Sequence, residues 1–78
     1  MDAIKEHARV VLTKSLSKDR LEAGDVGTVV HVYKDGSAYE VEFTTLEGGT
    51  AVVATVESSD VRPVSRREIT HARERAAS

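Results

Sequence analysis

Apolar and polar residues alternate in five short stretches of this chain. The alternation is clearest at residues 39–43, where Tyr39, Val41 and Phe43 are predicted to face inward and the two intervening glutamates to face water. The other stretches are residues 9–13, 26–33, 51–56 and 61–64. Short apolar stretches at roughly ten-residue spacing, separated by turn residues, predict a small barrel of antiparallel strands.

Turn residues punctuate this pattern. Asp35-Gly36, within the turn 34–37, predicts a hairpin, because glycine accepts the positive φ that tight turns require. Residues 15–24 read as a long polar loop, 44–50 as a turn and 58–60 as a short 3₁₀ turn. Gly27 interrupts the second stretch, which indicates a bulge or a close approach of another part of the chain.

Length limits the chain to one domain. Seventy-eight residues bury little surface, and no cysteine is present to add a disulfide or a thiolate metal site. The longest apolar runs are far shorter than the ~20 residues of a membrane helix. Residues 1–6 lack the basic and apolar pattern of a secretory signal. We therefore expect a cytoplasmic protein that does not contact a membrane.

The sequence changes character after Val64. Ser65 and Glu68 form a capping-box pattern, and the residues that follow are rich in alanine and arginine. Ile69, Ala72 and Ala76 give a thin apolar stripe at helical spacing. These signals predict a flexible or short helical segment at 1–7, a barrel at 8–64 and a short helix at 65–78.

Charge is unevenly distributed between the predicted barrel and residues 65–78. Residues 65–78 hold four arginines and two glutamates, an excess of two positive charges. Because the formal net charge of the chain is −2, residues 1–64 carry −4. An acidic barrel is a poor default surface for nucleic acid, whose backbone favours a basic face.

Catalytic and ligand-binding patterns are weak. His31 with Glu40 and Glu42 is the best candidate metal cluster, but such loose spacing more often reflects a solvated strand face. Gly24 and Gly27 are not followed by the lysine and helix of a phosphate loop. No serine lies in a nucleophile elbow. We therefore predict no catalytic residue, no cofactor and no metal.

The pattern of residues 9–13, 24–33, 39–43 and 61–64 resembles a family of small bacterial proteins classed as a domain of unknown function. The segment 24–30, Gly-Asp-Val-Gly-Thr-Val-Val, also resembles KOW-type domains and the β-subunit barrel of nitrile hydratase. These resemblances imply an SH3-like barrel that forms complexes, often with a product encoded nearby. They imply no catalytic residue, and they do not extend beyond Val64.

Together these observations predict an all-β protein, a small SH3-like barrel of about five antiparallel strands with a short C-terminal helix. The expected function is a non-catalytic protein-interaction module, an accessory, immunity or antitoxin-like partner of a separately encoded protein. The alternatives are a KOW-like RNA-binding role and a scaffold role in a nitrile hydratase-like enzyme. An unpaired strand edge and a marginal helix also favour self-association into a homodimer. The candidate partner-binding residues lie on the last strand and in the tail: Arg62, Val64, Arg66, Arg67, Ile69 and Arg73.

Overall fold

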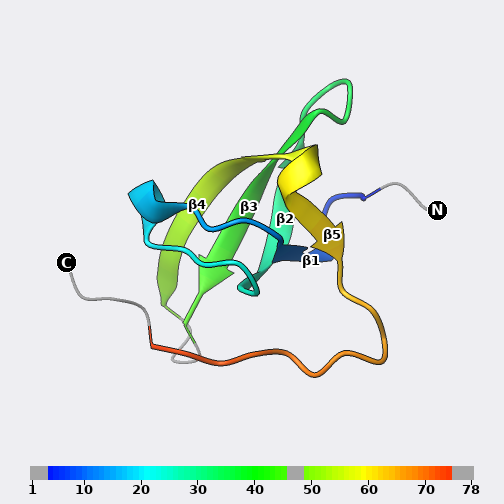
Figure 1. The fold of residues 1–78 in the computed structure, drawn as a ribbon. Helices are drawn as coiled ribbons and strands as arrows, with labels where there is room; N and C mark the ends of the chain where they lie inside the picture. Colours follow the sequence, from blue (N-terminus) through cyan, green and yellow to red (C-terminus); the bar gives the residue numbers. More distant parts are fainter. Residues whose placement is uncertain (1–3, 46–48, 75–78) are drawn as a thin grey trace.

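A computed structural model describes residues 4–45 and 49–74 of the chain, which form one five-stranded antiparallel sheet (Figure 1). The elements are β1 (Arg9–Leu12), η1 (Ser17–Asp19), β2 (Val26–Val32), β3 (Ala38–Thr44), β4 (Thr50–Glu57), η2 (Ser58–Asp60) and β5 (Val61–Pro63). The strand order is β4-β3-β2-β1-β5, so the last strand pairs with the first. The prediction of an all-β fold with five antiparallel strands is confirmed.

The β2–β3 hairpin closes where Asp35-Gly36 predicted it. Gly36 has a φ of +72°, and the Ser37 amide donates a hydrogen bond of 3.0 Å to Asp35 Oδ1. The Tyr33 amide donates to the Ala38 carbonyl at 3.1 Å, which joins the two strands at the turn. The turn is therefore fixed by local chemistry that the sequence already displays.

An irregularity in β2 changes which residues face the interior. The register with β3 shifts between Val29 and His31, and Val30 is 41% exposed while Val29 is fully buried. Strict alternation along residues 26–33 would place Val30 and Val32 on the same face of the sheet. The extra residue at the bulge puts them on different faces. Gly27 lies in the regular part of β2, where an added Cβ would fall 2.5 Å from Val41 Cγ1. A close approach therefore explains this glycine.

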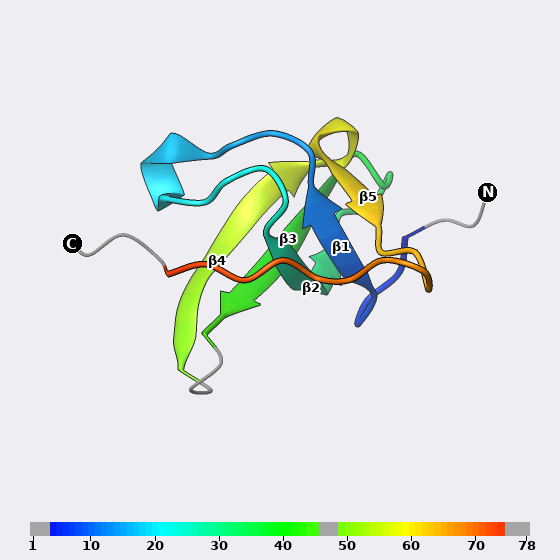
Figure 2. The same cartoon turned by 60° about the horizontal axis from the view of Figure 1, so that its bottom comes forward.

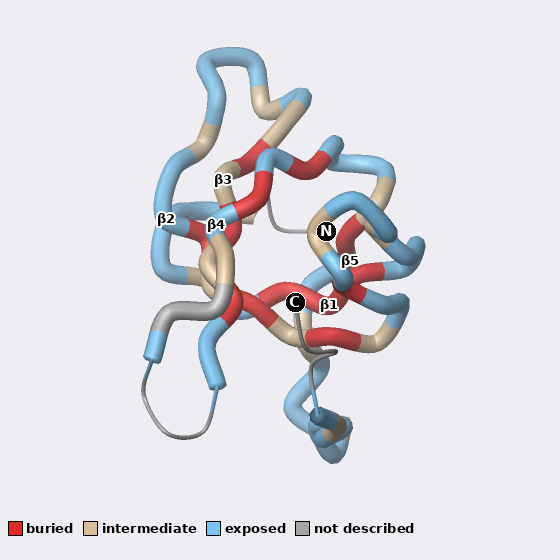
Figure 3. Tube along the Cα trace, turned by 90° about the vertical axis from the view of Figure 1, so that its left-hand side faces the viewer, coloured by how far each residue is buried: buried red, intermediate tan, exposed pale blue. Residues whose placement is uncertain are grey.

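The core lies on one face of the curved sheet, and Figure 3 shows that the buried segments come from strands on several sides of the centre of the molecule. The predicted inward positions Tyr39, Val41 and Phe43 are at most 6% exposed, as expected from their alternation. The remaining members of the buried cluster are Val10, Leu12, Leu21, Val29, Ala54, Val56 and Val61. Burying these side chains is the main force that holds a chain of this size together.

The segment after β5 is not the predicted helix. In its described part, residues 65–74 contain one turn at 66–67 and otherwise no regular structure, and the chain crosses in front of β1 and β2 (Figure 2). The capping-box contacts do form, with the Ser65 amide donating to Glu68 Oε1 at 2.6 Å, but they close only that turn. Residues 75–78 of the predicted helix lie outside the described part. Below, residues 64–74 are called the tail.

The start of the chain is attached to the sheet through β2. The predicted segment 1–7 is described from Ile4, and residues 1–3 lie outside the described part. The backbone turns at Glu6 and His7, and the His7 amide donates to the Val29 carbonyl at 2.7 Å. This bond falls at the β2 bulge, where the pairing between β2 and β3 is interrupted.

Candidate functional site

Asp25 is the one buried charged or polar residue among those described, at 9% exposure. It follows the turn that leads into β2, where Gly24 has a φ of +98°. Its carbonyl accepts from the Leu12 amide at 2.9 Å, and its carboxylate accepts from the Glu22 amide at 2.9 Å. These two hydrogen bonds hold the Asp25 carboxylate in place near β1, and both come from backbone amides.

Arg73 of the tail forms an ion pair with this carboxylate. Arg73 Nε donates to Asp25 Oδ1 at 2.9 Å and its NH2 donates to Oδ2 at 2.6 Å, which is the two-pronged geometry that arginine forms with carboxylates. The same NH2 group donates to the Arg20 carbonyl at 3.0 Å. Its NH1 group lies 3.6 Å from Glu22 Oε2. Nε and NH2 therefore donate to acceptors of the 20–25 loop, whereas NH1 donates to the Glu74 carbonyl of the tail at 3.1 Å and lies only within ion-pair distance of the loop.

His71 adds a second contact from the tail, with its Nε2 3.1 Å from Asp25 Oδ1. Residues 71 and 73 can reach one carboxylate together because side chains two apart share a side of an extended chain. In a helix, residues two apart do not face each other. The Asp25 contacts therefore explain why the tail is extended at this point rather than helical.

Opposing effects set the pKa of Asp25. Burial raises the pKa, but hydrogen bonds from Arg73, from the Glu22 amide and from His71, together with the charge of Arg73, bring it below the ordinary value of 3.8. The pKa of Arg73 is raised in turn, mainly by its hydrogen bonds to Asp25. The pair is thus fully charged near neutral pH, and the carboxylate is an acceptor with no competing proton.

A cavity of about 150 Å³ lies between the tail and the sheet. Its floor is a row across β2, β1 and β5, in which Val11 pairs with Val26 on one side and with Arg62 on the other. Val11 is 8% exposed but does not belong to the core cluster, because it points to the face opposite Val10 and Leu12. The tail side of the cavity comes from Val64, Glu68, Ile69, Thr70 and His71. The tail therefore covers a small strip on the outer face of the sheet, formed by Val11, Val26 and Arg62.

Arg62 anchors the other end of the tail. Its NH1 and NH2 groups donate to the two carboxylate oxygens of Glu68 at 2.7 and 2.5 Å. The hydrogen bonds from Arg62 and from the Ser65 amide lower the pKa of Glu68 to about 2. This pair is exposed, so it orients the first turn of the tail more than it stabilises it.

The predicted partner-binding residues fall into three groups. Arg62, Val64 and Ile69 line the cavity, whereas Arg73 lies at the Asp25 end. Arg66 and Arg67 form the exposed turn, in which the Arg67 amide donates to Ser65 Oγ at 3.3 Å. Sequence reasoning missed the acidic side of the site, Asp25 and Glu22, and it missed His71. The available signal was the His-x-Arg spacing in the tail, which suits an extended chain opposite a carboxylate.

Comparison with protein families gives one match. Residues 6–63 match the family described as a domain of unknown function, DUF4926. The chain belongs to this family. No curated protein and no solved structure matches the chain significantly.

The DUF4926 match divides the site. Asp25 and its loop lie inside the matched residues, as does Arg62, whereas the whole tail lies beyond them. The acceptor of the arginine is thus part of the family domain, and the arginine itself comes from a segment outside the match.

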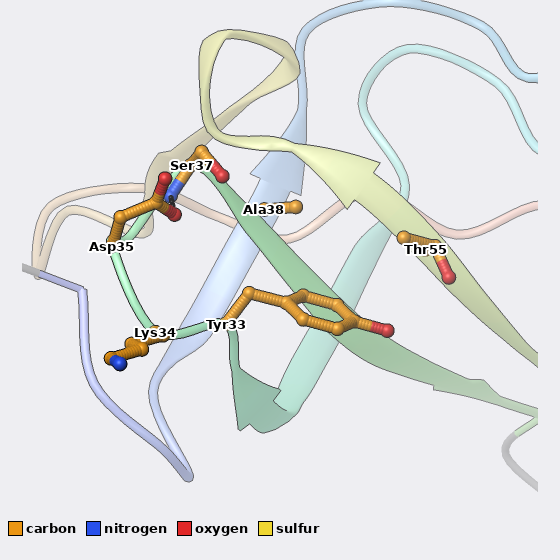
Figure 4. A pocket seen from close by; sticks show the side chains of 6 residues that line it. All are labelled: Tyr33, Lys34, Asp35, Ser37, Ala38 and Thr55. Atoms are coloured by element: carbon orange, nitrogen blue, oxygen red, sulfur yellow. Dashed lines mark hydrogen bonds between the residues drawn. The ribbon is translucent and has the colours of Figure 1, made fainter.

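A second, shallow hollow of about 690 Å³ lies beside the β2–β3 turn of the DUF4926 domain (Figure 4). It is bordered by Tyr33, the turn residues and Thr55, and the Tyr33 ring lies along its edge. Tyr33 and Thr55 both donate to Glu40 Oε2 at 2.5 Å, and these bonds lower the pKa of Glu40. The Glu40 carboxylate already accepts two hydrogen bonds, and the hollow is open to solvent. The Asp25 site is therefore the stronger candidate.

The described ranges 4–45 and 49–74 hold neither a cluster of metal ligands nor a membrane-spanning helix. They contain no group of three or more histidine, cysteine or acidic residues placed to hold a metal ion. His31, the histidine of the candidate metal cluster, packs edge-on against Tyr33 with ring centroids 5.0 Å apart. The same ranges contain no helix long and apolar enough to cross a membrane.

Proposed function

We propose that this DUF4926 protein is a non-catalytic protein-interaction module, an accessory, immunity or antitoxin-like partner of a separately encoded protein. One observation carries the proposal. The buried carboxylate of Asp25, in the family domain, accepts two hydrogen bonds from Arg73, which belongs to an extended segment outside the family match. Charge-assisted, two-pronged contacts of this kind give strength and geometric specificity to the recognition of extended segments.

In this proposal the curved sheet is an SH3-like barrel. The strand order, in which β5 returns to pair with β1, and the 3₁₀ turn directly before β5 support that assignment. The long loop between β1 and β2 corresponds to the first loop of such a barrel, and it carries the Asp25 site. The interaction surface is then the outer face of β2, β1 and β5, bordered by this loop.

A KOW-like RNA-binding role is less well supported. Of the arginines on β5 and in the tail, Arg62 forms an ion pair with Glu68 and Arg73 forms one with Asp25. The body of the chain is acidic, and phosphate contacts require free basic groups. A scaffold role beside a catalytic chain remains one form of the accessory function rather than a separate proposal.

The proposal is tested by affinity capture with the tagged full-length chain in its native host, followed by analytical ultracentrifugation with the separately purified partner. We expect a stoichiometric complex. A chain that captures no protein and stays monomeric at high concentration would overturn the proposal. Filter binding to RNA over a salt series is the matched control, and a salt-dependent affinity there would favour the KOW-like alternative instead.

A further inference from the structure

The loop at 20–25 is shaped for a guanidinium rather than for a positive charge in general. The Asp25 carboxylate takes two of the donors of Arg73, the Arg20 carbonyl takes another, and Glu22 lies within ion-pair distance of the third nitrogen. A lysine ammonium is a compact charge on a flexible stem and cannot satisfy acceptors arranged as a planar fork. The loop therefore selects arginine.

These acceptors are held in place by bonds that do not involve the tail. Asp25 is fixed by the Leu12 and Glu22 amides, and Gly24 donates to the Leu12 carbonyl at 2.8 Å. Arg20 has a φ of +58°, and its amide donates to the Ser17 carbonyl at 3.1 Å. An acceptor set that is built before its ligand arrives loses little entropy on binding.

The tail is attached to this site by few contacts. Across residues 69–74, the hydrogen bonds and ion pairs from the tail to the described body come from the side chains of His71 and Arg73. Ile69 is 96% exposed, so the largest apolar side chain of this stretch contributes little burial. A segment held in this way can leave without disturbing the core.

We propose that the Asp25 loop is a recognition site for an arginine on an extended segment of a separate partner protein, and that the tail occupies this site until the partner displaces it. This inference rests on the proposed function and adds the chemistry of the partner. The partner segment carries an arginine, enters the strip above Val11 in an extended conformation, and is attracted by an acidic body of charge −4. The tail then acts as a covalently attached competitor.

A separate protein fits this site better than a second copy of the chain. The tail of a second copy offers the same contacts as the attached tail, which competes at an effective concentration of about millimolar. An identical segment therefore cannot displace it at ordinary protein concentrations. A partner with further contacts on the β2–β1–β5 face can, because its additional binding energy offsets that of the tail.

The test uses the full-length chain and a synthetic peptide with the sequence of residues 66–74, Arg-Arg-Glu-Ile-Thr-His-Ala-Arg-Glu. Binding is followed by NMR at the Gly24 and Asp25 amides. The peptide should bind the double variant His71→Ala, Arg73→Ala at least about tenfold more tightly than the unchanged chain, whose own tail competes. Adding Asp25→Asn to the double variant, or replacing the last arginine of the peptide with lysine, should abolish the binding.

Equal affinity for the double variant and the unchanged chain would overturn the inference, and so would binding that survives Asp25→Asn. A dimer of the unchanged chain that dissociates in the Arg73→Ala variant would show that a second copy is the occupant, which also overturns it. Failure here differs from failure of the proposed function. A captured partner that binds the unchanged chain and the Asp25→Asn variant equally would retain the interaction role and place it on another surface.

Discussion

The sheet and the tail of this protein are held by different forces. The sheet buries an apolar cluster in which Val10, Val29 and Val41 are fully inaccessible to solvent. The tail contributes half-buried Val64 but otherwise depends on polar side chains, chiefly Arg73 at one end and Glu68 at the other. Apolar burial is cooperative and independent of pH, whereas a few charged contacts depend on single residues and on protonation. The tail is thus the part that can be released while the fold persists.

The sheet should be the more sensitive region. Leu12 is 1% exposed at the centre of the core, and Leu12→Ala should lower the free energy of unfolding by about 2–5 kcal/mol. A loss of this size approaches the whole stability of a small domain. Urea denaturation followed by circular dichroism measures it.

Val53→Ala is the matched control for Leu12→Ala. Val53 is also an aliphatic strand residue, but it is 47% exposed, so its truncation should change the unfolding midpoint little. Equal losses from both substitutions would contradict the assignment of the core to one face of the sheet.

Gly27→Ala is expected to have the next largest effect. The added Cβ would lie 2.5 Å from Val41 Cγ1 and 2.8 Å from Phe43 Cε1, both in the packed core. Relieving such contacts costs about 1–3 kcal/mol. At Gly49 the nearest atom to an added Cβ is 3.9 Å away, so Gly49→Ala is the control. Because Gly→Ala alone lowers the entropy of the unfolded chain, Gly49→Ala should not destabilise, and a loss as large as that of Gly27→Ala would contradict the close approach to β3 as the reason for Gly27.

The sheet could be predicted from the sequence better than the tail. Alternation and turn residues are local signals, and they placed the five strands and the 34–37 turn. The bulge in β2 could not be located from the sequence, because Val29 and Val30 are both apolar and nothing in the residues shows which of them leaves the regular pairing. The tail was assigned to a helix because its capping box and its alanines are local signals as well. The contact that overrides them joins Asp25 and Arg73, 48 residues apart, and the His-x-Arg spacing in the tail does not show which carboxylate it meets.

Arg73→Ala should release the tail and leave the sheet intact. The substitution removes the guanidinium from a buried carboxylate, which should cost about 1–3 kcal/mol. Hydrogen exchange should accelerate at residues 64–74 while the strands keep their protection. Arg67→Ala is the control, because Arg67 is an exposed arginine of the same segment. Loss of protection in the strands as well would mean that the tail is an integral part of the fold.

Acid should release the tail gradually. Because the pKa of Asp25 in the folded chain is below its ordinary value of 3.8, the contact adds stability above that value and is lost as the pH falls through the lowered pKa. Glu68, with a pKa of about 2, should release Arg62 only as the pH approaches that value. The amide NMR signals of Gly24 and His71, followed from about pH 5 to about pH 2, report the release at Asp25. In Asp25→Asn this transition should vanish, and its persistence would assign it to another group.

Arg62→Ala should have the smallest effect, although its ion pair with Glu68 is also formed by two hydrogen bonds. Arg62 meets Glu68 through two short hydrogen bonds, but the two side chains are 46% and 31% exposed. Water replaces such a pair at almost no cost, so the unfolding midpoint should not move measurably. The substitution should also leave hydrogen exchange at residues 71–74 unchanged, because those residues are held at Asp25. Exchange that accelerates along the whole tail would show instead that Arg62 and Asp25 act as one cooperative anchor.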